Sequence, residues 1–87
     1  MYSIIFTKKA EKQLSRLETN IKNRIIIAID RAKIRPESYF IRLVGEDLYK
    51  LRVGDYRVIA EIHGDKFIIL VVKIGHRKEV YKKYRNV

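Results

Sequence analysis

The sequence contains no cysteine and no tryptophan, and its 87 residues include one proline and four glycines. Without cysteine the chain can form neither a disulfide nor a thiolate metal site. The two histidines, His63 and His76, are too far apart in sequence for a metal-binding motif, and the glycines do not form a phosphate-cradling loop. The serines lie in no nucleophile elbow. The sequence therefore predicts no metal, no cofactor and no thiol or serine nucleophile.

Long apolar runs are also missing. No run approaches the ~20 residues that a transmembrane helix needs. The first residues, Met1 to Phe6, lack the basic region that opens a signal peptide. We therefore expect a cytoplasmic protein that makes no membrane contact. A chain of 87 residues that is 47% hydrophobic is expected to form a single domain over residues 1–87.

Acidic residues are scarce relative to basic ones. Ten Asp and Glu stand against twenty Lys and Arg, which gives a formal net charge of +10. On so small a domain this imbalance indicates binding to nucleic acid or to an acidic partner. A basic surface that binds nothing is the alternative.

The first third of the chain predicts a strand followed by two helices. A run rich in β-forming residues, 2–6, precedes Thr7, which is a good N-cap for the first helix. Thr19 or Asn20 is expected to cap the second helix. Pro36 ends that helix, because the residue before a proline is disfavoured in helical geometry. The break between the two helices, at Glu18-Thr19-Asn20, is short, and a short break predicts that they form an antiparallel hairpin.

Residues 48–57 predict a β-hairpin. Apolar residues at 49, 51 and 53 alternate with Lys50 and Arg52, as in a half-buried strand. Gly54-Asp55 is typical of a two-residue turn. In that register Arg52 lies opposite Arg57, and like charges facing each other across strands are unfavourable. The pattern indicates an anion site, with a solvated basic face as the alternative.

The rest of the chain predicts a second hairpin and a helical tail. A strand over residues 56–62 is expected to turn at 63–66 and return as a nearly unbroken apolar strand over 67–74, which is typical of an internal strand. With the turn at Gly64-Asp65, Arg57 is expected to pair near Val72. Gly75 is expected to end the strand, and a short helix follows with Val80 and Tyr84 facing inward.

The predicted fold class is α+β. The order is β-α-α-β-β-β, with a mainly antiparallel sheet, the helix hairpin on one face and a short C-terminal helical tail. Alternation predicts that the helices cover Tyr49, Leu51, Val53, Tyr56, Val58 and Ala60. The other face carries Ile59, Ile68 and Leu70, which need cover from the tail or from another protein.

Basic groups are expected to converge at one end of this sheet. The predicted site is lined by Lys50, Arg52, Arg57, Arg77 and Tyr81. It suits phosphodiester chemistry without a metal, because positive groups stabilise the charge on a pentacoordinate phosphorus. The alternative for Tyr81 is packing beneath the tail. His76 is suited to acid–base catalysis at neutral pH, and its alternative is a hydrogen-bonding turn residue.

The ordered set Leu43-Val44-Gly45, Tyr49-Lys50-Leu51-Arg52, Tyr56-Arg57 and Ile74-Gly75-His76-Arg77-Lys78-Glu79-Val80-Tyr81 resembles the RelE toxins of the RelE/ParE superfamily over nearly the whole chain. The resemblance implies a toxin of a type II toxin–antitoxin system that cuts mRNA in the ribosomal A site. The implied reaction is metal-independent: the ribose 2′-OH attacks the adjacent phosphate, leaving a 2′,3′-cyclic phosphate and a 5′-OH.

The resemblance also implies roles and partners. Lys50, Arg52 and Arg57 would hold and stabilise the phosphate, Arg77 would neutralise or help protonate the leaving oxygen, and Tyr81 would orient or activate the nucleophile. Further RNA contacts are expected from Lys73, Lys78, Lys82 and Lys83. The expected partners are the ribosome, mRNA and a RelB-type antitoxin, in a complex that is heterotetrameric or larger.

Two departures from the bacterial pattern bear on mechanism. Arg52 stands where bacterial relatives have a lysine, and arginine is a poorer proton donor. His76 stands beside Arg77, near a point where some relatives use a histidine. Two other functions remain open: a ParE-like toxin that inhibits DNA gyrase, and a non-catalytic nucleic-acid-binding module.

Overall fold

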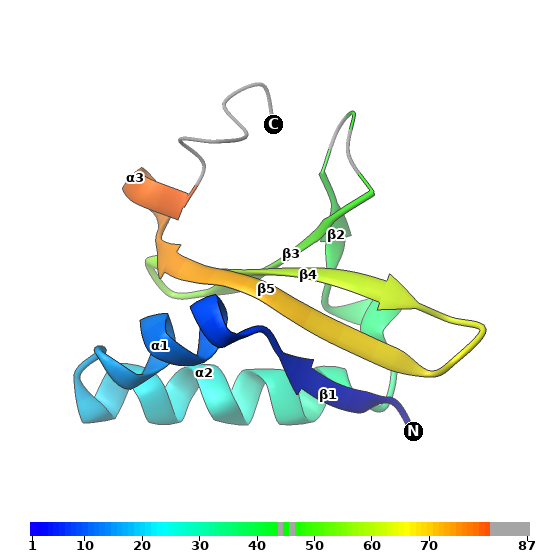
Figure 1. Ribbon diagram of the computed structural model, residues 1–87, viewed down its shortest axis with the longest axis horizontal. Helices are drawn as coiled ribbons and strands as arrows, with labels where there is room; N and C mark the ends of the chain where they lie inside the picture. Colours follow the sequence, from blue (N-terminus) through cyan, green and yellow to red (C-terminus); the bar gives the residue numbers. More distant parts are fainter. Residues whose placement is uncertain (44, 46, 81–87) are drawn as a thin grey trace.

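The computed structural model describes residues 1–43, 45 and 47–80 (Figure 1). Its elements are β1 (Ser3–Phe6), α1 (Lys8–Ser15), α2 (Thr19–Ala32), the 3-10 helix η1 (Pro36–Ser38), β2 (Ile41–Arg42), β3 (Tyr49–Val53), β4 (Tyr56–His63), β5 (Ile68–His76) and α3 (Arg77–Val80). This order confirms the predicted α+β fold class. No helix in the described part of the chain is long and apolar enough to span a membrane.

The five strands form one sheet in the order β1-β5-β4-β3-β2. β1 runs parallel to β5, and every other neighbouring pair is antiparallel. The helix hairpin α1–α2 covers one face of the sheet and α3 lies over the opposite face (Figure 1). β5, the predicted internal strand, lies between β1 and β4.

The predicted N-cap of α1 is confirmed, and the predicted N-cap of α2 is not. Thr7 caps α1, because its Oγ1 accepts a hydrogen bond from the Ala10 N–H at 3.1 Å. The predicted cap of α2 at Thr19 or Asn20 is wrong. The carbonyl of Glu18 already accepts the helical hydrogen bond from the Lys22 N–H at 2.9 Å, so Glu18 is the N-cap and Thr19 lies inside the helix.

The first hairpin has the predicted register. Val53 pairs with Tyr56 and Arg52 pairs with Arg57 across the Gly54-Asp55 turn. Gly54 has a φ of +59°, a left-handed conformation that glycine adopts without steric penalty.

The second hairpin has a different register from the predicted one. Arg57 pairs with Gly75 instead of lying near Val72. The loop is longer than a two-residue turn, since His63 pairs with Ile68, and an irregularity leaves Val72 without a partner on β4. Together these place Gly75 opposite Arg57 and let β5 run on through His76, so the prediction that Gly75 ends the strand is also wrong.

Two hydrophobic clusters lie on the two faces of the sheet. The larger joins the helix hairpin to the sheet and includes all six residues predicted for that face. The smaller consists of Leu43, Ile59 and Val80, with Leu48 and Val72 packed against it. Val80 is 1% exposed, which confirms that it faces inward, whereas Tyr84 is outside the described residues. The second cluster therefore attaches α3 to the sheet.

We predict that Ile59→Ala lowers the free energy of unfolding by about 2–5 kcal/mol, because Ile59 is fully buried in the second cluster. Ile27→Ala is the matched control, since Ile27 on α2 is 53% exposed. Urea denaturation of both variants measures the difference. Equal stability of the two variants would contradict the role given to the second cluster.

Candidate functional site

The first residue of α3 lies against the turn between β3 and β4. α3 begins with Arg77, whose backbone N–H donates a hydrogen bond to the Asp55 carbonyl at 2.8 Å. The Arg77 Nε also lies 3.8 Å from Asp55 Oδ1. Both side chains are more than half exposed, so the ion pair adds little stability, and the backbone hydrogen bond fixes the start of α3 beside the turn.

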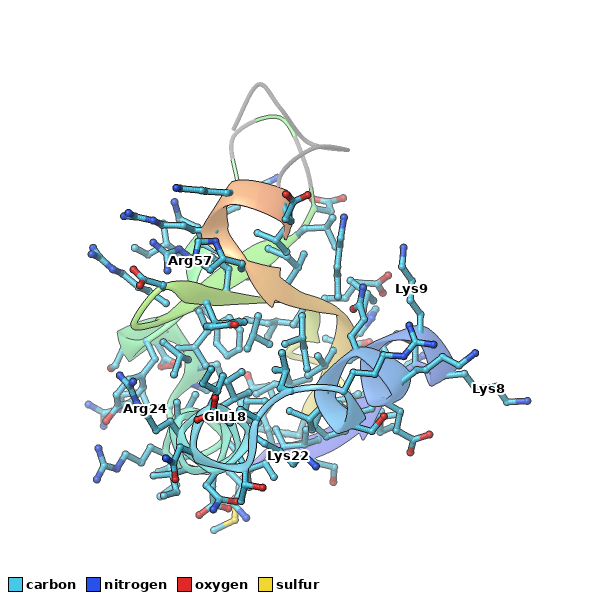
Figure 2. The ribbon with its side chains drawn as sticks, turned by 90° about the vertical axis from the view of Figure 1, so that its left-hand side faces the viewer. Lys8, Lys9, Glu18, Lys22, Arg24 and Arg57 are labelled. Carbon is cyan, nitrogen blue, oxygen red and sulfur yellow. The ribbon has the colours of Figure 1, made fainter. Side chains whose placement is uncertain are left out.

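Among the described residues, Arg57 is the only buried one with a charged or polar side chain, and it is 8% exposed. Its Nη1 donates two hydrogen bonds of 2.8 Å, one to the Gly54 carbonyl and one to the Tyr56 carbonyl. Figure 2 shows its side chain just below α3, on the face of the sheet away from the helix hairpin. The strand register and the carbonyls of the turn together hold the guanidinium there.

The remaining donors of Arg57 point to a ligand. Arg57 Nε and Nη2 make no hydrogen bond or ion pair within residues 1–43, 45 and 47–80. A buried cation with unmatched donors is unfavourable, and buried polar groups are nearly always hydrogen-bonded. A guanidinium presents its donors in a fork that matches a phosphate or carboxylate. The geometry suits an anion, and an anion site at Arg57 stays a prediction.

Other predicted basic residues lie on the same face. Arg52 is exposed and directly opposite Arg57. Lys50 and Lys73 both lie opposite Ile59, from the two neighbouring strands. The predicted convergence of Lys50, Arg52 and Arg57 on one face is therefore present, and α3 brings Arg77 to its edge.

His76 lies elsewhere. It pairs with Tyr56, one step along from the Arg57–Gly75 pair, and therefore belongs to the opposite face of the sheet. Its ring packs edge-to-face on Tyr56 at 5.5 Å, and its Nδ1 accepts a hydrogen bond from the Lys78 N–H at 3.1 Å. His76 therefore accepts a hydrogen bond, as in the non-catalytic alternative, but it does so from the last position of β5 and not from a turn. A catalytic role for His76 stays a prediction.

The sequence matches, over residues 4–81, the family described as the ParE toxin of the type II toxin–antitoxin system parDE. The chain belongs to this toxin family. The predicted membership of the RelE/ParE superfamily is thereby confirmed.

Relatives that carry the RelE name resemble the toxin in sequence and fold. Toxin RelE3 of Methanocaldococcus jannaschii is 27% identical over an alignment of 84 positions, and the alignment covers 90% of this chain and 93% of the relative. The archaeal RelE–RelB complex of Pyrococcus horikoshii contains a chain that is 27% identical, with a TM-score of 0.73 and coverage of 91% of this chain and 98% of that one. The RelBE complex of E. coli matches with a TM-score of 0.75 at 23% identity, covering 87% and 96% of the two chains.

The remaining predicted residues are placed only in part. Lys78 is exposed on α3, and Tyr81, Lys82 and Lys83 lie outside the described residues. In the part of the toxin that the structure describes, no three His, Asp or Glu side chains are close enough to hold a metal ion.

Sequence reasoning missed the role of the turn at this site. Asp55 appeared only as a turn residue, but its carbonyl holds Arg77, and the carbonyl of Gly54 holds Arg57. No local sequence pattern announces these acceptors, because every residue carries a backbone carbonyl.

We predict that inorganic phosphate raises the melting temperature of the toxin by binding at Arg57, because a ligand that binds only the folded state stabilises it. Arg57→Met should abolish most of this rise, while Arg35→Met, which alters an exposed arginine just before η1, should keep it. Thermal unfolding over a phosphate titration at constant ionic strength measures the effect. The same phosphate response in both variants would exclude Arg57 as the site.

Proposed function

We propose that the toxin is a ribosome-dependent, metal-independent endoribonuclease that cleaves mRNA in the ribosomal A site. The observation that carries the proposal is Arg57, a buried guanidinium whose Nε and Nη2 have no partner among the described residues, with Arg52 opposite and Arg77 nearby. This arrangement suits a phosphate that gains negative charge during the reaction.

The proposed step is an internal transfer at phosphorus. The ribose 2′ oxygen attacks the adjacent phosphorus and loses its proton, and the bond from phosphorus to the 5′ oxygen of the next nucleotide breaks. The products are a 2′,3′-cyclic phosphate and a 5′-OH, whose oxygen takes up a proton. Arg52 and Arg57 would stabilise the pentacoordinate phosphorus and Arg77 the leaving oxygen. A guanidinium stays protonated at neutral pH, so these side chains act through charge and hydrogen bonds.

Tyr81 and His76 are the residues proposed for proton transfer. The resemblance to RelE toxins gives Tyr81 the task of orienting or activating the 2′-OH. Histidine side chains commonly serve as general acids or bases, and His76 is the second candidate. To reach a phosphate at Arg57, its ring would have to leave Tyr56.

The family description bears on the second function that the sequence leaves open, a ParE-like toxin that inhibits DNA gyrase. Toxins of that kind are expected to lack the basic constellation. Retention of Arg57 and Arg77 beside the hairpin turn favours the nuclease. A supercoiling assay with purified gyrase tests the alternative directly.

We predict that the toxin cuts a defined mRNA at A-site codons only when ribosomes are present, as measured by primer extension. Arg57→Met and Arg77→Ala should each lower the cleavage rate by about 10²–10³-fold, the usual effect of losing one group that stabilises transition-state charge. Arg31→Ala, an exposed arginine on α2, is the control and should cleave normally.

Circular dichroism of each variant shows whether the fold survives. Full cleavage by a folded Arg57→Met, Arg77→Ala double variant would overturn the proposed nuclease site.

The proposed partner is a RelB-type antitoxin, as in the RelE–RelB complexes of P. horikoshii and E. coli. Two properties of the toxin support an amphipathic, acidic partner. The net charge is +10, and a largely apolar cleft of about 610 Å³ lies between β1 and α2. The lining of the cleft includes Ile4, Leu14 and Ile26, and Ile26 is 46% exposed.

We predict that Ile26→Lys weakens binding of the antitoxin encoded with this toxin by at least about tenfold, which corresponds to 1.4 kcal/mol. The change places a charge in the apolar cleft. Ile27→Lys is the matched control, because Ile27 is similarly exposed on the same helix but is not among the residues that line the cleft. Calorimetric titration measures both affinities, and equal losses would place the antitoxin elsewhere.

A further inference from the structure

A third arginine lies against the same hairpin turn. The guanidinium of Arg24, on α2, covers Gly54 so closely that a Cβ added to the glycine would lie 3.0 Å from Arg24 Nη2 and 3.6 Å from Cζ and Nη1. Gly54 therefore meets two requirements: it supplies the positive φ of the turn, and it leaves room for the guanidinium.

Arg24 and Arg57 lie on the two faces of this turn. Arg57 reaches the Gly54 carbonyl from the face under α3, and Arg24 lies on the side of the helix hairpin. Figure 2 shows both side chains along the same edge of the molecule, Arg24 beside α2 and Arg57 below α3. Basic groups thus continue from the proposed cleavage site around the end of the hairpin.

The environment of Arg24 leaves its charge available. Within the residues that the structure describes, its guanidinium makes no ion pair or hydrogen bond. It borders a cleft of about 140 Å³ between α2 and the hairpin, whose lining also includes Ile21, Asp55 and Tyr56. Asp55 is the acid of this cleft, and its carboxylate is the one that lies 3.8 Å from Arg77.

We propose that Arg24 binds a second backbone phosphate of the single-stranded nucleic acid, next to the phosphate held at Arg57. The inference rests on the proposed function, because the strand is the one whose scissile phosphate lies at Arg57. The strand passes around the Gly54-Asp55 turn, and Arg24 contributes to its position while taking no part in the bond changes. An aromatic and apolar wall beside a cation is the usual surroundings of one unpaired nucleotide.

The test measures binding separately from cleavage. The probe is a short single-stranded oligoribonucleotide with methylated 2′ hydroxyls, which cannot attack phosphorus. Its affinity is measured by fluorescence anisotropy over a range of salt concentrations, because each neutralised phosphate of a single strand adds about 0.7 to the slope of log affinity against log salt.

Arg24→Gln should lower that slope by about 0.7, and Arg24→Lys, which keeps the charge, should restore it. Arg31→Gln is the matched control, since Arg31 is exposed about two turns further along the same helix. An equal change in Arg24→Gln and Arg31→Gln would replace the site by a diffuse basic surface. An unchanged slope in Arg24→Gln, or a wild-type toxin that does not bind the probe at low salt, would overturn the proposal.

A second measurement locates the phosphate. One neutral methylphosphonate is placed at each linkage of the probe in turn, and the linkage at which a variant is insensitive marks the phosphate that its lost arginine contacted. Arg24→Gln and Arg57→Met should mark different, neighbouring linkages, and the same linkage for both would overturn the proposal. Absence of mRNA cleavage by the wild-type toxin with ribosomes would instead refute the nuclease while leaving these binding results intact.

Discussion

The Gly54-Asp55 turn is the constraint on which the site depends. Its two carbonyls accept hydrogen bonds from Arg57 on β4 and from the first residue of α3. Because these acceptors belong to adjacent residues of a tight turn, they fix the relative positions of two elements that are distant in the sequence. The left-handed φ of Gly54 shapes this turn.

The burial of Arg57 sets function against stability. Its guanidinium is removed from water, and no carboxylate in the described part of the chain neutralises it. Stability alone would favour an apolar side chain at this position. Unsatisfied groups of this kind are typical of sites that bind a partner from outside the protein. A toxin that an antitoxin keeps inhibited would have such a site.

Local patterns in the sequence predicted the parts of the site that depend on short-range geometry. The Arg52–Arg57 pair follows from a two-residue turn and strict alternation, so both register and face were correct. The Thr7 cap and the inward position of Val80 were likewise correct. The register between β4 and β5 was wrong because it depends on a longer loop and on one unpaired residue, Val72.

That error reached the site itself. A strand that ends at Gly75 leaves His76 without a face, so the sequence offers it beside Arg77 either as a catalytic residue or as a hydrogen-bonding turn residue. The observed pairing with Tyr56 puts it on the helix side of the sheet. Contacts such as Arg24 over Gly54 join separate elements, and no periodicity in one segment encodes them.

The unpaired Val72 has a consequence for how this strand is compared between relatives. Before it, Ile69 and Val71 belong to the core under the helices, and after it Ile74 does, so the inward positions change from odd to even numbers. The two halves of β5 therefore obey separate alternation phases. A relative that lacks this one residue would keep the same side chains on the same faces at both ends. An alignment without a gap would exchange inside for outside over half of the strand, and structural superposition is the sounder guide to equivalent residues here.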